Sequence, residues 1–532
     1  MSSLVRLQPV AAPPPSLNDN TADLDRLLRA LRHDLGAEEE RLLSVPHRHV
    51  PRVAECFRAC GFGGVAVLNE DQGRLEPVDL LPAAPLRLPA MALDLGTTHL
   101  EAVLLDLLSG QELARTTRVN SQISHGDDIL TRIHFATGGR GKEGCLEVLQ
   151  QAVLGDTNAL ARELAALAGC AVTDIRALSV AGNSAMAHLF LGLNPYHLCR
   201  EPYIPLVNAP GPVAAVELGL KLHAAAPVHV LPGVGAYFGG DLLAGIVASD
   251  LDLAEKPEML IDVGTNAEVV VGCRDWLVAC AGAAGPALEG GVAKMGMRAG
   301  TGVIERVDID PASGRLAFRV IGAAAGEGAA AAPKARGICG SGMIDLLAAL
   351  FQAEMIDIRG KLRSEKLGDR LLAGPDGPAF IVARAEETVD GQPVTVSQID
   401  LDALMRSKAA MYAILGTLMD QVGLPFAALE RIHVAGAFGR HIDPRRAVIM
   451  GMIPDLPLST YRPLGNSSLA GAGRYLLEGE ARRRIGEVAR KITYIELNVN
   501  HEFMIRFSGS RFIPHTDRAL FPSVPYQLTE NR

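Results

Sequence analysis

The chain has 532 residues, of which 48% are apolar and 4% aromatic, so it is long enough for several domains with large cores. Lysine and arginine number 51 against 60 aspartate and glutamate residues, and no basic arm stands out, so we expect no nucleic-acid partner. No apolar run of membrane-spanning length is free of Gly, Pro and charge, so we expect no transmembrane helix, no membrane partner and a cytoplasmic protein.

The first 88 residues are predicted to form a leader and a small domain. Residues 1–21, which begin "MSSLVRLQPVAAPPPSL", lack the layout of a signal peptide and are predicted to be a disordered leader. Residues 22–88 contain two helix-like stretches, "TADLDRLLRALRHDL" and "RVAECFRACG", and then a strand pair that turns at Asp71–Gly73. We therefore expect a small α/β domain that ends near the Pro-rich stretch "LPAAPLRLPA".

Residues 89–250 are predicted to form a first α/β lobe. Three strand candidates, "MALDLG", "HLEAVLLDL" and "QELARTTRVN", follow one another through short turns. Helical periods occupy residues 127–168, and the strand "IRALSVAG" then leads into the helix "NSAMAHLFLGL". A further strand and helix in residues 228–249 complete the lobe.

Residues 251–532 are predicted to form a second lobe that repeats the first. The segment "MLIDVGTNAEVVVGCRDWLVACAG" again has a strand, an Asp-x-Gly-Thr turn, a strand, a hairpin and a strand. Later, "ERIHVAGAFGRHIDP" is a buried strand that enters a Gly-rich turn. An internal repeat of a whole supersecondary unit indicates a duplicated architecture.

Each repeat places an Asp-x-Gly-Thr turn at the tip of an apolar strand. The glycine lets the backbone approach a ligand closely, and consecutive N–H groups with threonine hydroxyls offer donors to phosphate oxygens. A carboxylate beside those oxygens suits Mg²⁺ held largely through water. One such turn alone is commonly an ordinary tight turn, but two at corresponding points of duplicated sheets can hold a triphosphate from both sides of a cleft. The candidate residues are Asp94, Gly96, Thr97 and Thr98 in the first repeat, and Asp262, Gly264 and Thr265 in the second.

The motifs "ALDLGTT", "LIDVGTN" and "VAGAFG" resemble the phosphate-1, phosphate-2 and adenosine motifs of the ASKHA superfamily, which includes sugar kinases, heat-shock ATPases and actin. Longer segments resemble the reductive activators of corrinoid-dependent enzymes, among them "NSQISHGDDILTRI", "VAGNSAMAHLFLGLNP" and "GICGSGMIDLLAAL". This resemblance extends from about residue 40 to near residue 510. It implies two ASKHA lobes, each on a mixed five-stranded sheet, that bind ATP and Mg²⁺. The implied partner is a corrinoid protein or corrinoid-dependent methyltransferase, whose cobalt is reduced from Co(II) to Co(I).

The resemblance also implies roles for single residues. Asp94 and Asp262 would handle Mg²⁺, with Asp94 also acting in catalysis. The turns 96–98 and 264–266 would hold phosphates, which adds Asn266. Asp241 in "FGGDLLAGI" is similar in place to the catalytic aspartate of sugar kinases, where it could orient or deprotonate the attacking water, or else cap the following helix. The nucleoside would lie against Gly436, Ala437, Phe438 and Gly439.

The cysteines depart from the family pattern. Typical members carry an N-terminal ferredoxin domain or a C-terminal set of cluster cysteines, whereas this chain has no cysteine before residue 40 and none after Cys339. Only Cys56 and Cys60 are close together, and no four-thiolate spacing of an iron–sulfur cluster occurs. We expect no cluster in this chain, and a separate ferredoxin or flavoprotein as the electron donor. Cys339 lies on a turn comparable to the cluster loop of hydroxyacyl-CoA dehydratase activators, but no second cysteine accompanies it.

Five further polar residues have two interpretations each. Asp127 and Asp128 could face the phosphates, although capping of the following helix is favoured. Asn183 and Glu289 sit at strand-to-helix turns, where nucleotide or hinge contacts compete with a core role. His433 precedes the Gly-rich turn within an apolar strand, so a hydrogen-bonded core histidine is expected there.

Three functions compete. The first is an ATP-dependent activator of a corrinoid protein, with ATP hydrolysis coupled to the partner. The second is a small-molecule kinase, which would need a polar acceptor pocket in the first lobe, where "SVAGNSAMAHLFLGL" is too apolar. The third is an ATP-gated chaperone or assembly factor without a redox role. A homodimer is also expected to be possible, with the apolar helix near residues 408–420 as its contact.

Overall fold

The chain divides into two compact units. The first is Met1–Ala248 with Ser467–Arg490, and the second is Ser249–Asn466 with Lys491–Arg532. Residues 467–490, which the sequence analysis placed in the second lobe, therefore belong to the first unit. The computed structural model describes residues 3–35, 43–71, 74–138, 144–264, 266–282, 293–297, 299–322, 333–374, 377–436, 439, 442–497 and 501–525.

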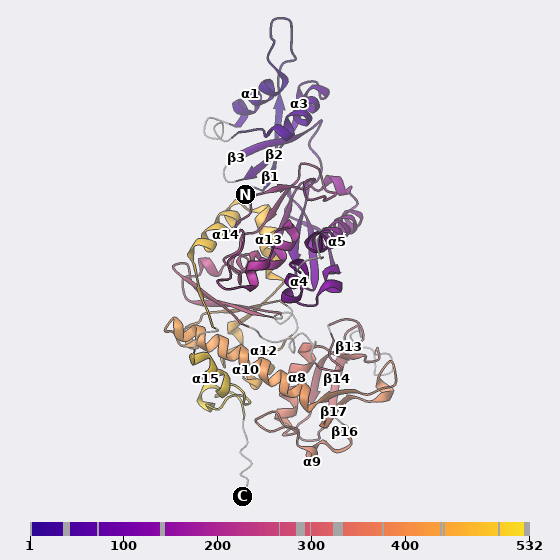
Figure 1. The fold of residues 1–532 in the computed structure, drawn as a ribbon, viewed down its shortest axis with the longest axis vertical. Helices are drawn as coiled ribbons and strands as arrows, with labels where there is room; N and C mark the ends of the chain where they lie inside the picture. The colour runs from indigo at the N-terminus through magenta and orange to yellow at the C-terminus, as the bar shows by residue number, and fades with distance from the viewer. Residues whose placement is uncertain are drawn as a thin grey trace. The chain divides into compact units, whose positions relative to one another are not determined.

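The first unit begins with a small domain whose described residues form one antiparallel sheet and the helices α1 and α3 (Figure 1). Its elements are β1 (Val5–Ala11), β2 (Gly63–Asp71), β3 (Arg74–Leu81), α1 (Asp23–Leu35) and α3 (Val50–Ala59). Leu27 and Leu31 of α1 and Phe57 of α3 are fully buried in the core that they form with the sheet. The predicted helices and strand pair are confirmed here.

The prediction of a disordered leader over residues 1–21 is wrong for Val5–Ala11, because this segment is strand β1, paired antiparallel with β2. Leu4 and Val5 are fully buried, and the Leu4 N–H donates to the Leu476 carbonyl at 2.8 Å. Pro9 lacks an N–H group, but an edge strand tolerates proline. Burial of its apolar residues therefore orders a segment whose neighbouring Pro-rich run suggested disorder.

A buried carboxylate joins the small domain to the rest of the first unit. Asp79 of β3 accepts hydrogen bonds from Arg52 at 2.9 and 3.2 Å and from Arg176 at 2.6 Å. His223 Nε2 lies 3.1 Å from the same carboxylate. Burial alone would raise the pKa of Asp79, but its interactions with His223, Arg52 and Arg176 outweigh burial and lower the pKa. Arg176 and His223 come from the following lobe, so this cluster fixes the small domain to it.

The lobe that follows has a six-stranded sheet in the order β6-β5-β4-β7-β9-β8. Its strands are β4 (Pro89–Leu95), β5 (His99–Asp106), β6 (Glu112–Val119), β7 (Leu178–Gly182), β8 (Val213–Ala214) and β9 (Pro227–Val230). Its helices are α4 (Ile129–Ala136), α5 (Cys145–Ala168), α6 (Ser184–Leu191), α7 (Gly240–Ser249), α13 (Ser467–Leu477) and α14 (Gly479–Lys491). Since β4, β7 and β9 are parallel, their carboxyl ends share one edge.

The second unit has another six-stranded sheet, in the order β20-β19-β10-β11-β12-β21, and two sheets of three strands, β14-β13-β15 and β16-β17-β18. The strands of the large sheet are β10 (Glu258–Val263), β11 (Ala267–Gly272), β12 (Leu277–Gly282), β19 (Ile432–Ala435), β20 (Tyr461–Gly465) and β21 (Ile492–Ile495). The small sheets contain β13 (Val303–Ile309), β14 (Leu316–Val320), β15 (Gly337–Ile338), β16 (Leu371–Gly374), β17 (Gly377–Ala383) and β18 (Val394–Ser397). The helices are α8 (Gly340–Gln352), α9 (Ser364–Leu367), α10 (Gln398–Gln421), α12 (Pro444–Met450) and α15 (His501–Gly509).

The two large sheets share one strand plan. In each, three antiparallel strands are followed by parallel neighbours, β6-β5-β4-β7-β9 in the first and β12-β11-β10-β19-β20 in the second. Asp94 pairs in register with Ala181, and Asp262 pairs in register with Ala435. The predicted duplication and the two α/β lobes with mixed sheets are confirmed. Each sheet has six strands where the resemblance implied five, because β8 and β21 add an edge strand each.

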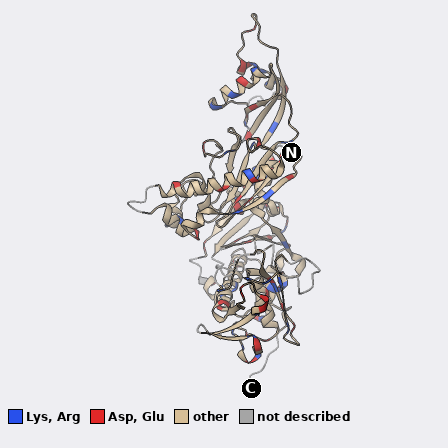
Figure 2. Cartoon of the chain, turned by 90° about the vertical axis from the view of Figure 1, so that its right-hand side faces the viewer, with Lys and Arg blue, Asp and Glu red and all other residues tan. Residues whose placement is uncertain are grey.

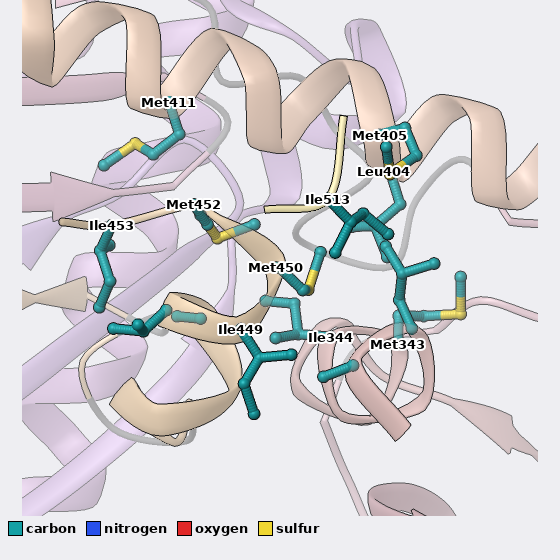
Figure 3. Close-up of a cluster of buried hydrophobic side chains, with 14 of the residues drawn as sticks. Met343, Ile344, Leu404, Met405, Met411, Ile449, Met450, Met452, Ile453 and Ile513 are labelled. Atoms are coloured by element: carbon teal, nitrogen blue, oxygen red, sulfur yellow. The ribbon is translucent and has the colours of Figure 1, made fainter. Parts of the chain in front are cut away.

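The second unit is held by a large apolar core in which α8, α10 and α12 meet. Figure 3 shows Ile344, Leu404, Met450 and Ile513 pointing into this core, and all four are buried. Positions of Lys or Arg and of Asp or Glu are interspersed along the described helices and strands (Figure 2). Among the described helices, we find none that is long and apolar enough to cross a membrane.

Candidate functional site

The first Asp-x-Gly turn joins β4 to β5 at the carboxyl edge of the first sheet. Asp94 is half-buried near the end of β4, and its Oδ1 accepts a hydrogen bond of 2.8 Å from the Ser468 hydroxyl. A Cβ at Gly96 would lie 2.3 Å from the His99 carbonyl oxygen, so only glycine fits this turn. Thr97 and Thr98 are half-buried and complete the turn.

Two asparagines contact this turn. Asn183 Nδ2 donates to Thr97 Oγ1 at 3.2 Å, while its Oδ1 accepts the Met186 N–H at 2.9 Å and so caps α6. Asn120 Nδ2 donates to the Gly96 carbonyl at 3.0 Å. Asn183, a candidate from the sequence, therefore caps a helix and contacts the turn at once, whereas Asn120 was not singled out.

Asp241 lies in the first turn of α7, at the same edge of the sheet, and its Oδ1 accepts the Leu242 N–H at 2.8 Å. The preceding glycines allow close packing, since a Cβ at Gly239 would lie 2.2 Å from the Gly182 carbonyl oxygen. A carboxylate in the first turn also suits the positive end of the helix dipole. The position is compatible with both interpretations of Asp241, capping and catalysis.

Asp128 is the N-cap of α4, because its carboxylate accepts the Thr131 N–H at 2.8 Å and the Thr131 hydroxyl at 3.0 Å. This backbone hydrogen bond from Thr131 lowers the pKa of Asp128. The favoured interpretation, capping, is confirmed for Asp128. Asp127 is exposed beside it.

The second Asp-x-Gly turn joins β10 to β11 in the second unit. The Gly264 N–H donates to the Asn266 carbonyl at 2.9 Å, which closes the turn, and Asn266 is exposed. Asp262 reaches the neighbouring Gly-rich turn, since a Cβ at Gly436 would lie 2.7 Å from Asp262 Oδ1. The structure thus brings the predicted phosphate-2 and nucleoside residues together within one sheet.

Some predicted residues lie outside the described residues. These are Thr265, Glu289, Ala437 and Phe438. Gly439 is described and half-buried, and a Cβ there would lie 2.0 Å from the Val434 carbonyl oxygen. The two described glycines of the nucleoside turn, Gly436 and Gly439, therefore both sit where a side chain would collide with backbone or with Asp262.

His433 and Cys339 are buried parts of the second unit. His433 is 5% exposed, and its Nε2 lies 2.6 Å from Glu258 Oε2, so the prediction of a hydrogen-bonded core histidine is confirmed. Cys339 precedes α8, is 3% exposed, and its Sγ lies 3.2 Å from the Ser341 hydroxyl. Among the described side chains, no three His, Cys, Asp or Glu residues gather in a group that could hold a metal ion.

Sequence reasoning missed Ser468, although a signal for it was present. The sequence Gly-Asn-Ser occurs twice between a strand and a helix. It spans Gly182–Ser184 at the end of β7 and residues 465–467 at the end of β20. The second occurrence starts α13, whose second residue is Ser468. A search for repeats of this short turn would have marked the second as a counterpart of the first.

Comparison with known proteins shows the family of the chain. A family model described as the C-terminal domain of RACo, the ASKHA domain, matches residues 256–525, and models of the RACo middle region and the RACo linker region match residues 89–254 and 1–82. The corrinoid activation enzyme RamQ of Eubacterium limosum is 32% identical over 439 residues, which cover 80% of this chain and 71% of that protein.

Two further similar proteins are also described as acting on corrinoid proteins. The Co(II) methylated amine-specific corrinoid protein reductase of Methanosarcina barkeri is 26% identical over 438 residues, covering 76% of this chain and 72% of that protein. The solved structure of a reductive activator for a corrinoid, iron–sulfur protein has a TM-score of 0.87 and 35% identity, over 98% of this chain and 81% of that one. The chain therefore belongs to the RACo family, the reductive activators of corrinoid proteins that carry an ASKHA domain.

Proposed function

We propose that this reductive activator uses Mg²⁺-ATP, bound by its two Asp-x-Gly turns, to promote the reduction of a partner corrinoid protein from Co(II) to Co(I). The proposal rests on one observation: the two turns occupy corresponding positions in two sheets with the same strand order. Asp94 and Asp262 each pair with the alanine of a Val-Ala-Gly sequence at the end of the neighbouring parallel strand. Such a pair of turns is suited to a polyphosphate, because glycine turns can present backbone N–H groups to phosphate oxygens and each strand end supplies a carboxylate for Mg²⁺.

The residues fit a nucleotide. Gly96 and Gly436 both sit where a Cβ would collide with neighbouring atoms, so the backbone itself lines these positions and a ligand can approach it closely. Under this proposal Asp94 and Asp262 would hold Mg²⁺, and the turns 96–98 and 264–266 would bind phosphate oxygens. Bound Mg²⁺ would supply neutralisation of the phosphate charge. Asp241 orients the attacking water and accepts its proton.

The electron comes from a separate donor in this proposal. One electron leaves a reduced ferredoxin or flavoprotein and arrives at the cobalt, while ATP supplies free energy and no electron. The eight cysteines are all free thiols, spread over both units, and burial raises the pKa of the Cys280 thiol. Apart from Cys56 and Cys60, no two of these thiols are close in the sequence, and a cluster normally needs four.

The cavity beside α6 in the first unit is too small for a sugar-sized phosphate acceptor. The cavity beside α6 and the start of α7, lined by Ser184, His188, Asn208 and Gly239 among others, measures about 20 Å³. That volume holds a water molecule and not a sugar. This cavity therefore gives no support to the kinase alternative.

The test is phosphate release from Mg²⁺-ATP with and without a Co(II) corrinoid protein, in the presence of a reduced ferredoxin. Co(I) formation is followed by its absorbance in the same samples. We expect the corrinoid protein to stimulate phosphate release, and Co(I) to form faster with ATP than without. Asp262→Asn should abolish both effects, whereas Asp275→Asn, an exposed carboxylate of the same unit, should change neither.

Three outcomes would contradict the proposal. Co(I) formation at equal rates with and without ATP would remove the role of ATP. Phosphate transfer to a small acceptor, with no response to the corrinoid protein, would support the small-molecule kinase function instead. An ATP-gated chaperone without a redox role would instead bind the corrinoid protein tightly with ATP and leave its cobalt as Co(II).

A further inference from the structure

The first phosphate turn is held by an asparagine that is completely buried. Asn120 follows strand β6 and is 0% exposed. Its Nδ2 donates to the Gly96 carbonyl at 3.0 Å, and its backbone N–H donates to the Thr98 carbonyl at 2.9 Å. One residue therefore engages two carbonyl groups of the turn. These hydrogen bonds turn both carbonyl oxygens toward the interior. A phosphate bound at the turn would therefore not face oxygens that repel it.

Asn120 is itself fixed by a second buried residue. Its Oδ1 accepts the Gln122 N–H at 3.0 Å, which caps the 3₁₀ turn Ser121–His125. The Gln122 side chain is also completely buried, and its Nε2 donates to the Leu149 carbonyl of α5 at 2.8 Å. Both ends of the Asn120 amide are thus engaged, so its orientation follows from the fold and not from a bound ligand.

A buried arginine completes the network. Arg132 of α4 is 0% exposed, and it donates from Nε to the Gly126 carbonyl at 2.8 Å and from Nη1 to Gln122 Oε1 at 3.3 Å. Its Nη2 has no partner among the described residues. Burial lowers the pKa of Arg132 to about 10, so the side chain stays charged at neutral pH. The carboxylates of Asp128 and Asp127 partly offset the cost of burying this cation.

The second phosphate turn is built differently. There the Gly264 N–H donates to the Asn266 carbonyl, so the turn is closed by its own backbone. The first turn depends on residues that follow the third strand of its sheet. The two turns are therefore separable by mutation, although they occupy equal places in the duplicated fold.

We propose that Asn120 is a positioning residue of the first phosphate turn: held by Gln122 and Arg132, it keeps the Gly96 and Thr98 carbonyls inward and leaves the N–H groups of the turn for the phosphates. The inference rests on the proposed function, because it assigns that turn to ATP phosphates. It predicts that Asn120 affects binding of the triphosphate and not of the nucleoside.

The decisive variant is Asn120→Asp. Aspartate keeps the shape and can still accept the Gln122 N–H, but it places an oxygen against the Gly96 carbonyl and loses that hydrogen bond. The matched control is Asn158→Asp, because Asn158 donates from Nδ2 to the Gly219 carbonyl at 3.3 Å and accepts the Lys221 N–H at 2.7 Å. The pattern of bonds is the same at a site on α5 that is not bonded to the turn.

Calorimetric titration with Mg²⁺-ATP and with adenosine gives the readout, and thermal unfolding shows whether each variant folds. We expect Asn120→Asp to weaken Mg²⁺-ATP binding by about ten- to a hundredfold and to leave adenosine binding within about twofold of wild type. Asn158→Asp should change neither. Gln122→Met, which keeps the length of the side chain, should weaken Mg²⁺-ATP binding by a smaller factor and serves as the second variant where Asn120→Asp fails to fold.

The outcomes separate this inference from the proposed function. Wild-type affinity of both Asn120→Asp and Gln122→Met for Mg²⁺-ATP would overturn the inference and leave the function standing. Equal losses for ATP and adenosine would also overturn it, since they indicate a general structural defect. Wild-type protein that binds no Mg²⁺-ATP would overturn both.

Discussion

The Ser468 hydroxyl donates a hydrogen bond of 2.8 Å to Asp94 Oδ1, although 374 positions separate the two residues in the chain. Ser468 is the second residue of α13, a helix that packs against β4 and β7 within the first unit. The preceding strand, β20, belongs to the second unit. The carboxylate proposed to hold Mg²⁺ is therefore oriented by the helix through which the chain returns to the first unit.

Ser468→Ala should raise the Mg²⁺ concentration that ATP binding requires by about three- to tenfold, because Asp94 loses a hydrogen bond worth about 1 kcal/mol and its fixed orientation. The measurement is a Mg²⁺ titration at constant ATP. Ser467→Ala is the matched control, since the buried Ser467 hydroxyl has no partner among the described residues. An equal Mg²⁺ requirement in wild type and Ser468→Ala would show that this hydrogen bond does not serve the metal.

Gly436→Ala should abolish most ATP binding while leaving the second unit folded. The added Cβ would lie 2.7 Å from Asp262 Oδ1 and 2.9 Å from the Val263 carbonyl oxygen, so the carboxylate must move. We expect Mg²⁺-ATP affinity to fall by about tenfold or more, which is about 1.4 kcal/mol or more. Affinity is measured by titration, and unfolding is followed by fluorescence of Trp276, the single tryptophan, which packs against the core of this unit.

Gly423→Ala is the control for backbone strain. Gly423 has φ +67°, close to the φ of +73° at Gly436, but a Cβ there meets nothing within 4 Å. Both variants should therefore lose about 1 kcal/mol of stability from the left-handed backbone. A loss of ATP affinity in Gly423→Ala as large as in Gly436→Ala would show that general destabilisation is responsible, and not displacement of Asp262.

The sequence predicted those parts of the site that are local. Asp94 and Asp262 end strands with a clear apolar pattern and are followed at once by glycine, so their turns and their equivalence could be predicted from short segments. The bonds of Ser468 to Asp94 and of Asn120 to Gly96 could not, because they join residues brought together only by the packing of the sheet.

Sequence patterns also did not predict two features of the fold, for a related reason. These are strand β1 and the place of residues 467–490 in the first unit. Both depend on burial against distant elements, as when the Leu4 N–H bonds to the Leu476 carbonyl. Propensity within a short window carries no information on such contacts, and a neighbouring Pro-rich run biases the window toward disorder.

Asp345 should make the second unit less stable as pH rises from about 4 to 6. Burial raises the pKa of Asp345 to about 6, against the opposing effects of Arg306 and Arg446. Between the unfolded value near 3.8 and this folded value, the native state holds a proton that the unfolded chain has released. The stability contribution is therefore complete below about pH 4 and is lost above about pH 6, by up to about 3 kcal/mol.

Urea unfolding followed by Trp276 fluorescence between pH 4.5 and 7, roughly the window set by that linkage, measures this slope. Asp345→Asn, which cannot ionise, should flatten it and be more stable than wild type at pH 7. Asp308→Asn removes an exposed carboxylate that pairs with Arg446 at 2.6 Å and should keep the wild-type slope. If Asp345→Asn retains the full pH dependence, the titrating group lies elsewhere.

Lys408 of α10 ties the C-terminal segment to the second unit. Its side chain is 0% exposed, and Nζ donates to the Phe512 carbonyl at 2.6 Å and the Pro514 carbonyl at 2.7 Å. Complete burial lowers the pKa of Lys408. Ile513, between these two carbonyls, points into the apolar core beside Leu404 of the same helix (Figure 3). Lys408 thus holds residues 512–514 by hydrogen bonds, and Ile513 holds the same residues by apolar packing.

Lys408→Met should loosen this segment more than it lowers the global stability of the unit. Three carbonyls, those of Gly451, Phe512 and Pro514, lose their donor, at about 1–3 kcal/mol each, but removal of a buried amine offsets much of this cost. We expect trypsin to cleave after the exposed Arg511 at least about fivefold faster, since the local opening that cleavage needs costs less by about 1 kcal/mol. Lys361→Met is the control. Lys361 forms a half-exposed ion pair of 2.8 Å with Asp402, which lies on α10. Unchanged cleavage after Arg511 in Lys408→Met would mean that Ile513 and its apolar neighbours hold the segment without the lysine.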